Sequence, residues 1–435
     1  MRIIGDKGST NGIRRRRRGT LACAAGVFLL MFGGPVRADA NFDKWREELW
    51  LEAKSRGIDR RLFDEATNVP LDLTLSDLVI PGRPVKEQAE FQRLPSEYIS
   101  QQQISQLARK GRQHLATYGK LLRSVEAKYG VPGNVVIAIW GRETDYGAEQ
   151  QRHYVIPSLV TLAYLGKRKD MFREELLIAL ELVREGAISI NAMGSWTGAM
   201  GHTQFEPSDF RKFAADGDGD GKIDLENSIP DALASAAKQL QDYGWKKSKR
   251  WAIEVRLPAE VSCVESSPEI KRTLGEWLEL GLLPAPNMGV SFDMLEDQAT
   301  LVLPAGIYGP AFLAFENFQV FRRYNQSDVY AIFVGHLADR IAGGPVFEKA
   351  WAKLPPINNR EIAEIQRMLR DFALYAGSVD GRLGPATRRA IGQYQQSTGQ
   401  KVDCWPGAIA RRYGNSTAAQ APPSAKRGPN PSAPK

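Results

Sequence analysis

A carboxylate stands on the apolar face of a predicted helix. The pattern predicts this helix within residues 131–147, which open near a proline and close at a glycine. Val136, Ile139, Trp140 and Glu143 fall on one face, because residues three or four apart are neighbours on a helix. A carboxylate among apolar side chains loses hydration, which disfavours its charged form and raises its pKa.

A carboxyl group that is protonated at neutral pH is what a general acid needs to protonate a leaving oxygen. Asp145 lies two residues further on, about 200° around the helix, and so cannot share the site with Glu143. The segment alone favours another interpretation, in which Glu143 forms an ion pair with a buried arginine.

A second segment whose side chains could bind a substrate is 194–205, GSWTGAMGHTQF. Its glycines and small residues suit a tight turn or a close backbone approach. Neutral hydrogen-bonding groups mixed with aromatic rings suit an uncharged sugar polymer, and they suit a polar loop packed on a core nearly as well. These groups are Ser195, Trp196, His202, Thr203, Gln204 and Phe205.

The elements that must position these residues are mostly helical. Alternating apolar residues predict strands at 251–257 and 299–303, so that 251–310 forms a small β-containing insertion. Apolar residues at helical spacing predict the remaining elements. The predicted helices cover 102–129, 172–185, 231–243 and 328–341.

The first 40 residues have the features of an export signal. A run of five arginines, Arg14 to Arg18, precedes 12 apolar residues at 21–32, and small residues follow near Ala38 and Ala40. The apolar stretch is too short to span a bilayer, which takes about 20 residues. We therefore predict a cleaved signal peptide at 1–40, a periplasmic protein and no membrane span in the mature chain.

The charge of the whole chain has little bearing on its partners. The 435 residues carry a formal charge of +8, from 58 basic and 50 acidic residues. The predicted signal peptide holds eight of the basic and two of the acidic residues, which leaves 50 against 48. A mature charge of +2 does not argue for nucleic acid as a partner.

Cysteine usage leaves two alternatives open. Cys263 and Cys404 fall in what we interpret as separate domains. An oxidising compartment permits a bridge between them. Two partly buried free thiols are the favoured alternative.

An acidic, glycine-rich loop at 216–227 matches part of an EF-hand pattern. Asn227 takes the place of the usual bidentate glutamate, which weakens a conventional calcium site. The alternatives are a structural calcium site and a solvated acidic turn, and we expect no cofactor for catalysis. The candidate ligands are Asp216, Asp218, Asp220, Lys222 through its carbonyl group, and Asp231.

Several motifs in order resemble one family. GRETDYG, GSWTGAMGHTQF, DGDGDGKIDLENSIPDALASAAKQL and NFQVFRRYNQSDVYAI are similar to lytic murein transglycosylases of the membrane-bound lytic transglycosylase B type. The resemblance covers roughly 41–345. It implies a mainly α, lysozyme-like catalytic domain that cleaves the β-1,4 bond between N-acetylmuramic acid and N-acetylglucosamine and leaves a 1,6-anhydro product.

The resemblance also implies site residues. It places the catalytic acid and base at Glu143, which outweighs the ion-pair interpretation. The implied substrate is the glycan strand of peptidoglycan, and we expect a monomer. The implied sugar-contacting residues are Ser195, Gln204, Phe205, Tyr324, Asn325 and Tyr330.

Two departures from the family pattern stand out. Glu206 replaces a common methionine, and Lys238-Gln239 replaces a frequent Asn-Tyr pair. A carboxylate at Glu206 could alter Glu143 or serve a hydrolysis by water, although we interpret it as peripheral. The alternative functions are therefore a muramidase of the same fold and a non-catalytic peptidoglycan-binding protein.

The C-terminal part contains a second unit. Residues 355–414 include VDGRLGPATRRAIGQYQ, which resembles the small three-helix peptidoglycan-binding domain found beside wall hydrolases. The implied role is to hold the enzyme on insoluble wall, which raises the local substrate concentration. Residues 415–435 are rich in Pro, Ala and Ser, and we expect them to be disordered.

Overall fold

The computed structural model describes residues 40–80, 93–286, 288–407 and 409. The predicted signal peptide, except for Ala40, and the predicted disordered tail lie outside these ranges. Within them, no helix is both long enough and apolar enough to cross a bilayer.

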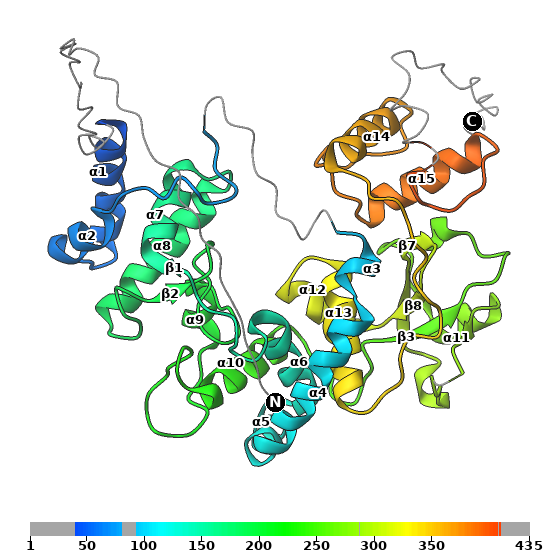
Figure 1. The fold of residues 1–435 in the computed structure, drawn as a ribbon, viewed down its shortest axis with the longest axis horizontal. Helices are drawn as coiled ribbons and strands as arrows, with labels where there is room; N and C mark the ends of the chain where they lie inside the picture. Colours follow the sequence, from blue (N-terminus) through cyan, green and yellow to red (C-terminus); the bar gives the residue numbers. More distant parts are fainter. Residues whose placement is uncertain (1–39, 81–92, 287, 408, 410–435) are drawn as a thin grey trace, which may run out of the picture. The chain divides into compact units, whose positions relative to one another are not determined.

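The described chain is mainly helical, as predicted (Figure 1). The helices of the first part are α1 (Ala40–Ser55), α2 (Arg60–Thr67), α3 (Pro95–Tyr98), α4 (Gln101–Thr117), α5 (Gly119–Tyr129), α6 (Gly133–Thr144), α7 (Val155–Leu165), α8 (Lys169–Arg184), α9 (Pro207–Phe213) and α10 (Ile229–Asp242). The later helices are α11 (Leu274–Glu279), α12 (Glu316–Tyr324), α13 (Asp328–Ile341), α14 (Asn359–Asp371) and α15 (Pro385–Ser397), with short 3₁₀ helices η2 (Cys263–Glu265) and η3 (Phe292–Met294).

Helix α6 lies at the centre of the largest apolar core. It packs against α4, α5, α10 and α13. Val136 and Ile139 are fully buried and Trp140 is nearly so, as expected for a helix that is apolar on all sides. The predicted helix 102–129 is divided at Tyr118 into α4 and α5, which both pack on α6.

The insertion predicted to contain strands forms a small antiparallel sheet with the order β4-β6-β8-β3-β5. Ile253 and Leu301 both lie opposite Leu313 of the central strand β8, so one register aligns three apolar side chains in the core of the sheet. The strands outside this sheet are β1 and β2, which pair with each other, and β7. The strands are β1 (His153–Tyr154), β2 (Met193–Gly194), β3 (Ala252–Arg256), β4 (Arg272–Thr273), β5 (Leu283–Pro284), β6 (Gln298–Val302), β7 (Pro304–Ile307) and β8 (Ala311–Ala314).

The C-terminal module contains α14 and α15 around a small core of its own. Ile365, Leu369, Ala390 and Ile391 are buried in this core. A third helix after α15 would fall largely beyond the described residues.

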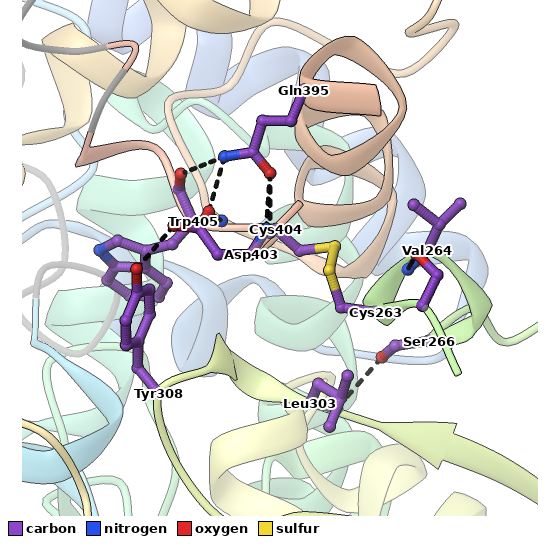
Figure 2. Close-up of a disulfide and its surroundings, with 10 residues drawn as sticks. Cys263, Val264, Ser266, Leu303, Tyr308, Gln395, Asp403, Cys404 and Trp405 are labelled. Carbon is purple, nitrogen blue, oxygen red and sulfur yellow. Dashed lines mark hydrogen bonds between the residues drawn. A yellow bond between two sulfur atoms is a disulfide. The ribbon is translucent and has the colours of Figure 1, made fainter. Parts of the chain in front are cut away.

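A disulfide between Cys263 and Cys404 joins the module to the sheet insertion, and the favoured prediction of two free thiols was wrong (Figure 2). The two cysteines are 141 residues apart, and only the docking of the module loop on η2 brings them together. Gln395 of α15 holds that loop, because its carboxamide oxygen accepts hydrogen bonds from the backbone N–H groups of Asp403 and Cys404 at 3.0 and 2.9 Å.

The disulfide closes a long loop and should stabilise the fold. We expect that replacing Cys263 and Cys404 together by serine lowers the free energy of unfolding by about 2–5 kcal/mol. Chemical unfolding of wild type with and without a reductant checks this. The reduced wild type should unfold at the midpoint of the double variant, whereas equal stability of oxidised wild type and double variant would contradict the expectation.

Candidate active site

The carboxyl group of Glu143 projects from the last turn of α6 and is half-buried. The Tyr330 hydroxyl, from α13, donates a hydrogen bond to its Oε1 at 2.5 Å. Burial, and then the charge of Glu143, raise the pKa of Tyr330 well above its usual range. Tyr330 therefore stays protonated and remains a hydrogen-bond donor to the carboxyl group.

Arg142 lies next to this pair, with its guanidinium carbon 5.9 Å from the centroid of the Tyr330 ring. Its guanidinium donates to the Tyr98 hydroxyl at 2.6 Å and lies over the rings of Tyr98 and Phe333. Burial disfavours its charged form, but Tyr98 and Glu143 outweigh that effect and raise its pKa above the usual value. The sequence motifs did not single out Arg142 or Tyr98, although an arginine inside an apolar helix is a visible signal.

Helix α6 ends three residues before the predicted Gly147. Asp145, Tyr146 and Gly147 all have positive φ angles, of 48°, 64° and 81°. This backbone is costly for the two residues with side chains. Their side chains are held in place, since Asp145 forms an ion pair with Lys110 at 2.7 Å and the Tyr146 hydroxyl donates to the Leu107 carbonyl at 2.9 Å.

The end of α6 is bound directly to the second predicted segment. The Thr144 hydroxyl donates to the carbonyl of His202 at 2.8 Å, and the Trp140 indole N–H donates to His202 Nδ1 at 3.1 Å. A side chain at Gly147 would collide with the His202 ring, at 2.6 Å from its Cε1. Segment 194–205 is therefore fixed in position relative to Glu143.

The predicted sugar-contacting residues of that segment differ in exposure. Ser195 is partly buried, and its hydroxyl accepts from the backbone N–H groups of Thr197 and Ala199. Gln204 is also partly buried and has a positive φ of 54°. Phe205 is fully buried and pairs with Met200 through its backbone, so its ring packs in the core and does not present a face to a ligand.

The remaining predicted contacts lie on α12, on α13 and in the turn between them. The rings of Tyr324 and Tyr330 are stacked, with centroids 6.2 Å apart and planes 9° apart. The Tyr324 hydroxyl donates to the Thr203 carbonyl at 2.6 Å, which ties α12 to the second segment. Asn325 caps the end of α12. The structure thus gathers Glu143, Tyr324 and Tyr330 through direct contacts.

Glu206 belongs to a carboxyl cluster with Glu175 and Asp209. Burial, and then repulsion by Glu175, raise the pKa of Glu206 to about 7, and the same causes raise that of Asp209 to about 6. Glu175 is 6% exposed and accepts hydrogen bonds from the N–H and the hydroxyl of Ser208. The carboxyl groups that raise the pKa of Glu206 therefore lie on α8 and α9.

The acidic loop brings together three of the predicted metal ligands. Carboxylate oxygens of Asp216, Asp218 and Asp231 lie within 4.8 Å of one another. The pKa of Asp216 is lowered by the N–H groups of Gly221 and Gly219. Asp220 lies outside this cluster and is exposed, and its Oδ1 accepts from the Lys222 N–H at 2.8 Å.

The raised pKa of Glu206 predicts a pH-dependent stability. A carboxyl group with a folded pKa near 7 and an unfolded pKa near 4.5 contributes stability that is present below pH 4.5 and is lost as the pH rises through 7. We expect Glu206→Gln to be more stable than wild type by on the order of 2 kcal/mol at about pH 8 and nearly equal at about pH 4.5. Chemical unfolding at both pH values measures this, with the exposed Glu149→Gln as a matched control. A constant difference across this range would contradict the assignment.

Two parts of the chain are similar to known protein families. Residues 41–339 match the model of the transglycosylase SLT domain, and residues 358–419 match a putative peptidoglycan binding domain. The chain is 30% identical over 217 residues to membrane-bound lytic murein transglycosylase B of Escherichia coli (strain K12). That alignment covers 49% of this chain and spans 58% of the relative's length.

Two crystal structures of SltB3 from Pseudomonas aeruginosa are also similar. They contain NAG-anhNAM-pentapeptide and NAG-NAM-pentapeptide, are 36% identical to this chain and superpose with TM-scores of 0.74 and 0.75. They cover 85% of this chain and 98% and 99% of their own. The predicted mainly α, lysozyme-like fold is confirmed. The chain belongs to the transglycosylase SLT domain family.

Proposed function

We propose that this protein is a lytic transglycosylase that cleaves the β-1,4 bond between N-acetylmuramic acid and N-acetylglucosamine in the glycan strands of peptidoglycan. The observation that carries the proposal is a single carboxyl group, Glu143, set in the apolar core helix and hydrogen-bonded to the hydroxyl of Tyr330, whose raised pKa keeps it a donor at neutral pH. Family membership and the peptide-bearing disaccharides in SltB3 support the choice of substrate.

Glu143 acts first as an acid. Its protonated carboxyl group gives its proton to the glycosidic oxygen, and the bond from that oxygen to C1 of the muramic acid breaks. The Tyr330 hydroxyl bonds more strongly to the resulting carboxylate than to the neutral acid, so it stabilises the form left behind.

Glu143 then acts as a base. The carboxylate takes the proton of the C6 hydroxyl of the same muramic acid, whose oxygen attacks C1 and closes the 1,6-anhydro ring. Glu143 is now protonated again, by the proton of the C6 hydroxyl, and no water is consumed. A hydrolase would use a second carboxylate beside the bond. Asp145 is engaged by Lys110, and Glu206 interacts mainly with the cluster on α8 and α9.

The site of action follows from the substrate. Peptidoglycan lies outside the cytoplasm, and the disulfide suits an oxidising compartment. Together with the basic and apolar N-terminal pattern, these points support export to the periplasm by a cleaved signal. The putative peptidoglycan binding domain would keep the catalytic domain on the insoluble wall.

The acidic loop is a candidate structural calcium site. Three carboxylates that converge from the loop and the start of α10 supply the hard oxygen ligands that calcium prefers. The ion would fix the loop between α9 and α10, and it would take no part in the proton transfers.

Removal of the Glu143 carboxyl group tests the catalytic proposal. We expect Glu143→Gln to lower the release of soluble fragments from purified peptidoglycan by about a hundred- to ten-thousand-fold, because an amide cannot exchange the proton. Mass analysis of the fragments should show anhydro ends with wild type and with the control Glu149→Gln. Fragment release by Glu143→Gln at the wild-type rate would disprove the assignment, and reducing ends with wild type would identify a muramidase.

Calcium should stabilise the fold through the three aspartates. With free calcium about a hundredfold above its dissociation constant, we expect a gain of about 2.7 kcal/mol in wild type. Asp218→Asn should lose this gain, while Asp170→Asn, on α8, should keep it. Thermal unfolding in calcium and in a chelator measures the effect, and an unchanged midpoint in millimolar calcium would refute the site.

A further inference from the structure

A cavity of about 350 Å³ lies where the C-terminal module meets the turn between α12 and α13. One wall includes residues 326 and 327 of that turn with residues 328 and 329 at the start of α13, and the other includes residues 380–388 of the module. The same turn begins next to Tyr324 and leads to Tyr330, which holds Glu143. Residues that line the cavity are therefore neighbours in the sequence of Tyr324 and Tyr330, which form part of the active site.

Bonds besides the disulfide join the module to the rest of the chain. Arg388 of α15 donates to Asp328 of α13 at 3.1 Å, and both side chains are less than a tenth exposed. The Tyr308 hydroxyl donates to Asp403 at 2.7 Å. The backbone N–H of Ala352, in the segment between α13 and α14, donates to the Tyr308 carbonyl at 2.9 Å. The ion pair between Arg388 and Asp328 thus joins the two walls of the cavity directly.

The lining of the cavity carries a surplus of positive charge. Its arginines outnumber its aspartates by four to two. Asp328 is engaged by Arg322 and Arg388. Asp380 accepts from the Gln366 side chain at 2.8 Å and from the Arg382 backbone N–H at 2.9 Å. The arginines are Arg93, Arg322, Arg382 and Arg388.

Two further features of the wall favour an anion. Helix α15 begins at the cavity with Gly384 and Pro385, and its N-cap makes no side-chain hydrogen bond. The N-terminus of a helix attracts negative charge. In addition, the guanidinium of the buried Arg388 places a positive charge in this wall, in the first turn of α15, where its nitrogens donate to the Leu383 carbonyl and to Asp328.

The charge indicates which part of peptidoglycan fits. A neutral sugar ring gains no charge–charge attraction in a cationic cavity. The peptide stems on muramic acid carry carboxylates, which arginine binds well. A volume of about 350 Å³ is at the small end for a ligand pocket and suits a few residues of a peptide.

We propose that this cavity binds a carboxylate of the peptide stem, so that the module selects peptide-bearing glycan for the active site. This inference rests on the proposed function. It gives the module a part in substrate choice beyond adhesion to the wall.

The test uses the full chain with Glu143→Gln, so that no ligand is cleaved. The probes are N-acetylglucosaminyl-N-acetylmuramyl pentapeptide and the same disaccharide without peptide and with its lactyl carboxyl group capped as an amide, so that only the first probe carries carboxylates; both are titrated by calorimetry. We expect the peptide-bearing probe to bind more tightly. Arg382→Ala and Arg93→Ala should each lower the ratio of the two affinities by about tenfold, the loss expected for one hydrogen bond to a charged group.

The matched control is Arg367→Ala, an exposed arginine of α14 outside the cavity lining, which should keep the ratio. An unchanged ratio in both cavity variants, or the same change in the control, would overturn the inference. Failure of the proposed function is distinguishable, because it would appear as wild-type enzyme that forms no anhydro ends from any glycan. Equal affinity of the Glu143→Gln chain for the two probes, with anhydro ends still formed by the wild-type enzyme, would overturn only the role of the cavity.

Discussion

The structure depends on placing one ionisable carboxyl group at the edge of an apolar core. Glu143 ends a helix whose Val136, Ile139 and Trp140 are buried, and a carboxylate in such a place is unfavourable unless it is hydrogen-bonded. The Tyr330 hydroxyl meets that need at 2.5 Å, and its own burial keeps it protonated. The same bond joins α6 to α13. The contact that offsets the cost of burying the carboxyl group therefore also fixes its position.

The surrounding elements hold this pair from both sides. Thr144 and Trp140 of α6 bind His202, and Tyr324 of α12 binds Thr203, so segment 194–205 is tied to the helix that carries Glu143 and to the helix that precedes α13. The strained backbone at Asp145 and Tyr146 is maintained by their side chains and allows the chain to turn directly after Glu143. The positive φ angles of Asp145 and Tyr146 thus lie at the exit from α6, and a further one lies at Gln204 in the second segment.

Sequence periodicity predicted the elements well where one apolar face determines them. The helix 328–341 has the predicted bounds, and the helix carrying Glu143 was expected from three buried neighbours. The end of α6 was misplaced, because two residues with side chains adopt a conformation usual for glycine. The disulfide was missed for a different reason: residues 141 apart in the chain meet only through the docking of two domains, which leaves no local pattern. Glu143 and Tyr330 are likewise far apart in the chain. Family resemblance predicted Tyr330 as a site residue, but its hydrogen bond to Glu143 could be seen only in the folded structure.

The central claim is that Glu143 gives one proton to the leaving oxygen and takes another from the C6 hydroxyl, while water stays out of the reaction. Digestion of purified peptidoglycan in water enriched in the heavy oxygen isotope tests this most directly. This mechanism predicts that the new muramic acid ends carry no heavy oxygen, because C1 bonds to an oxygen the sugar already holds. Heavy oxygen at C1 of freshly formed ends would contradict it, since that result would show that water attacked and that the enzyme is a hydrolase.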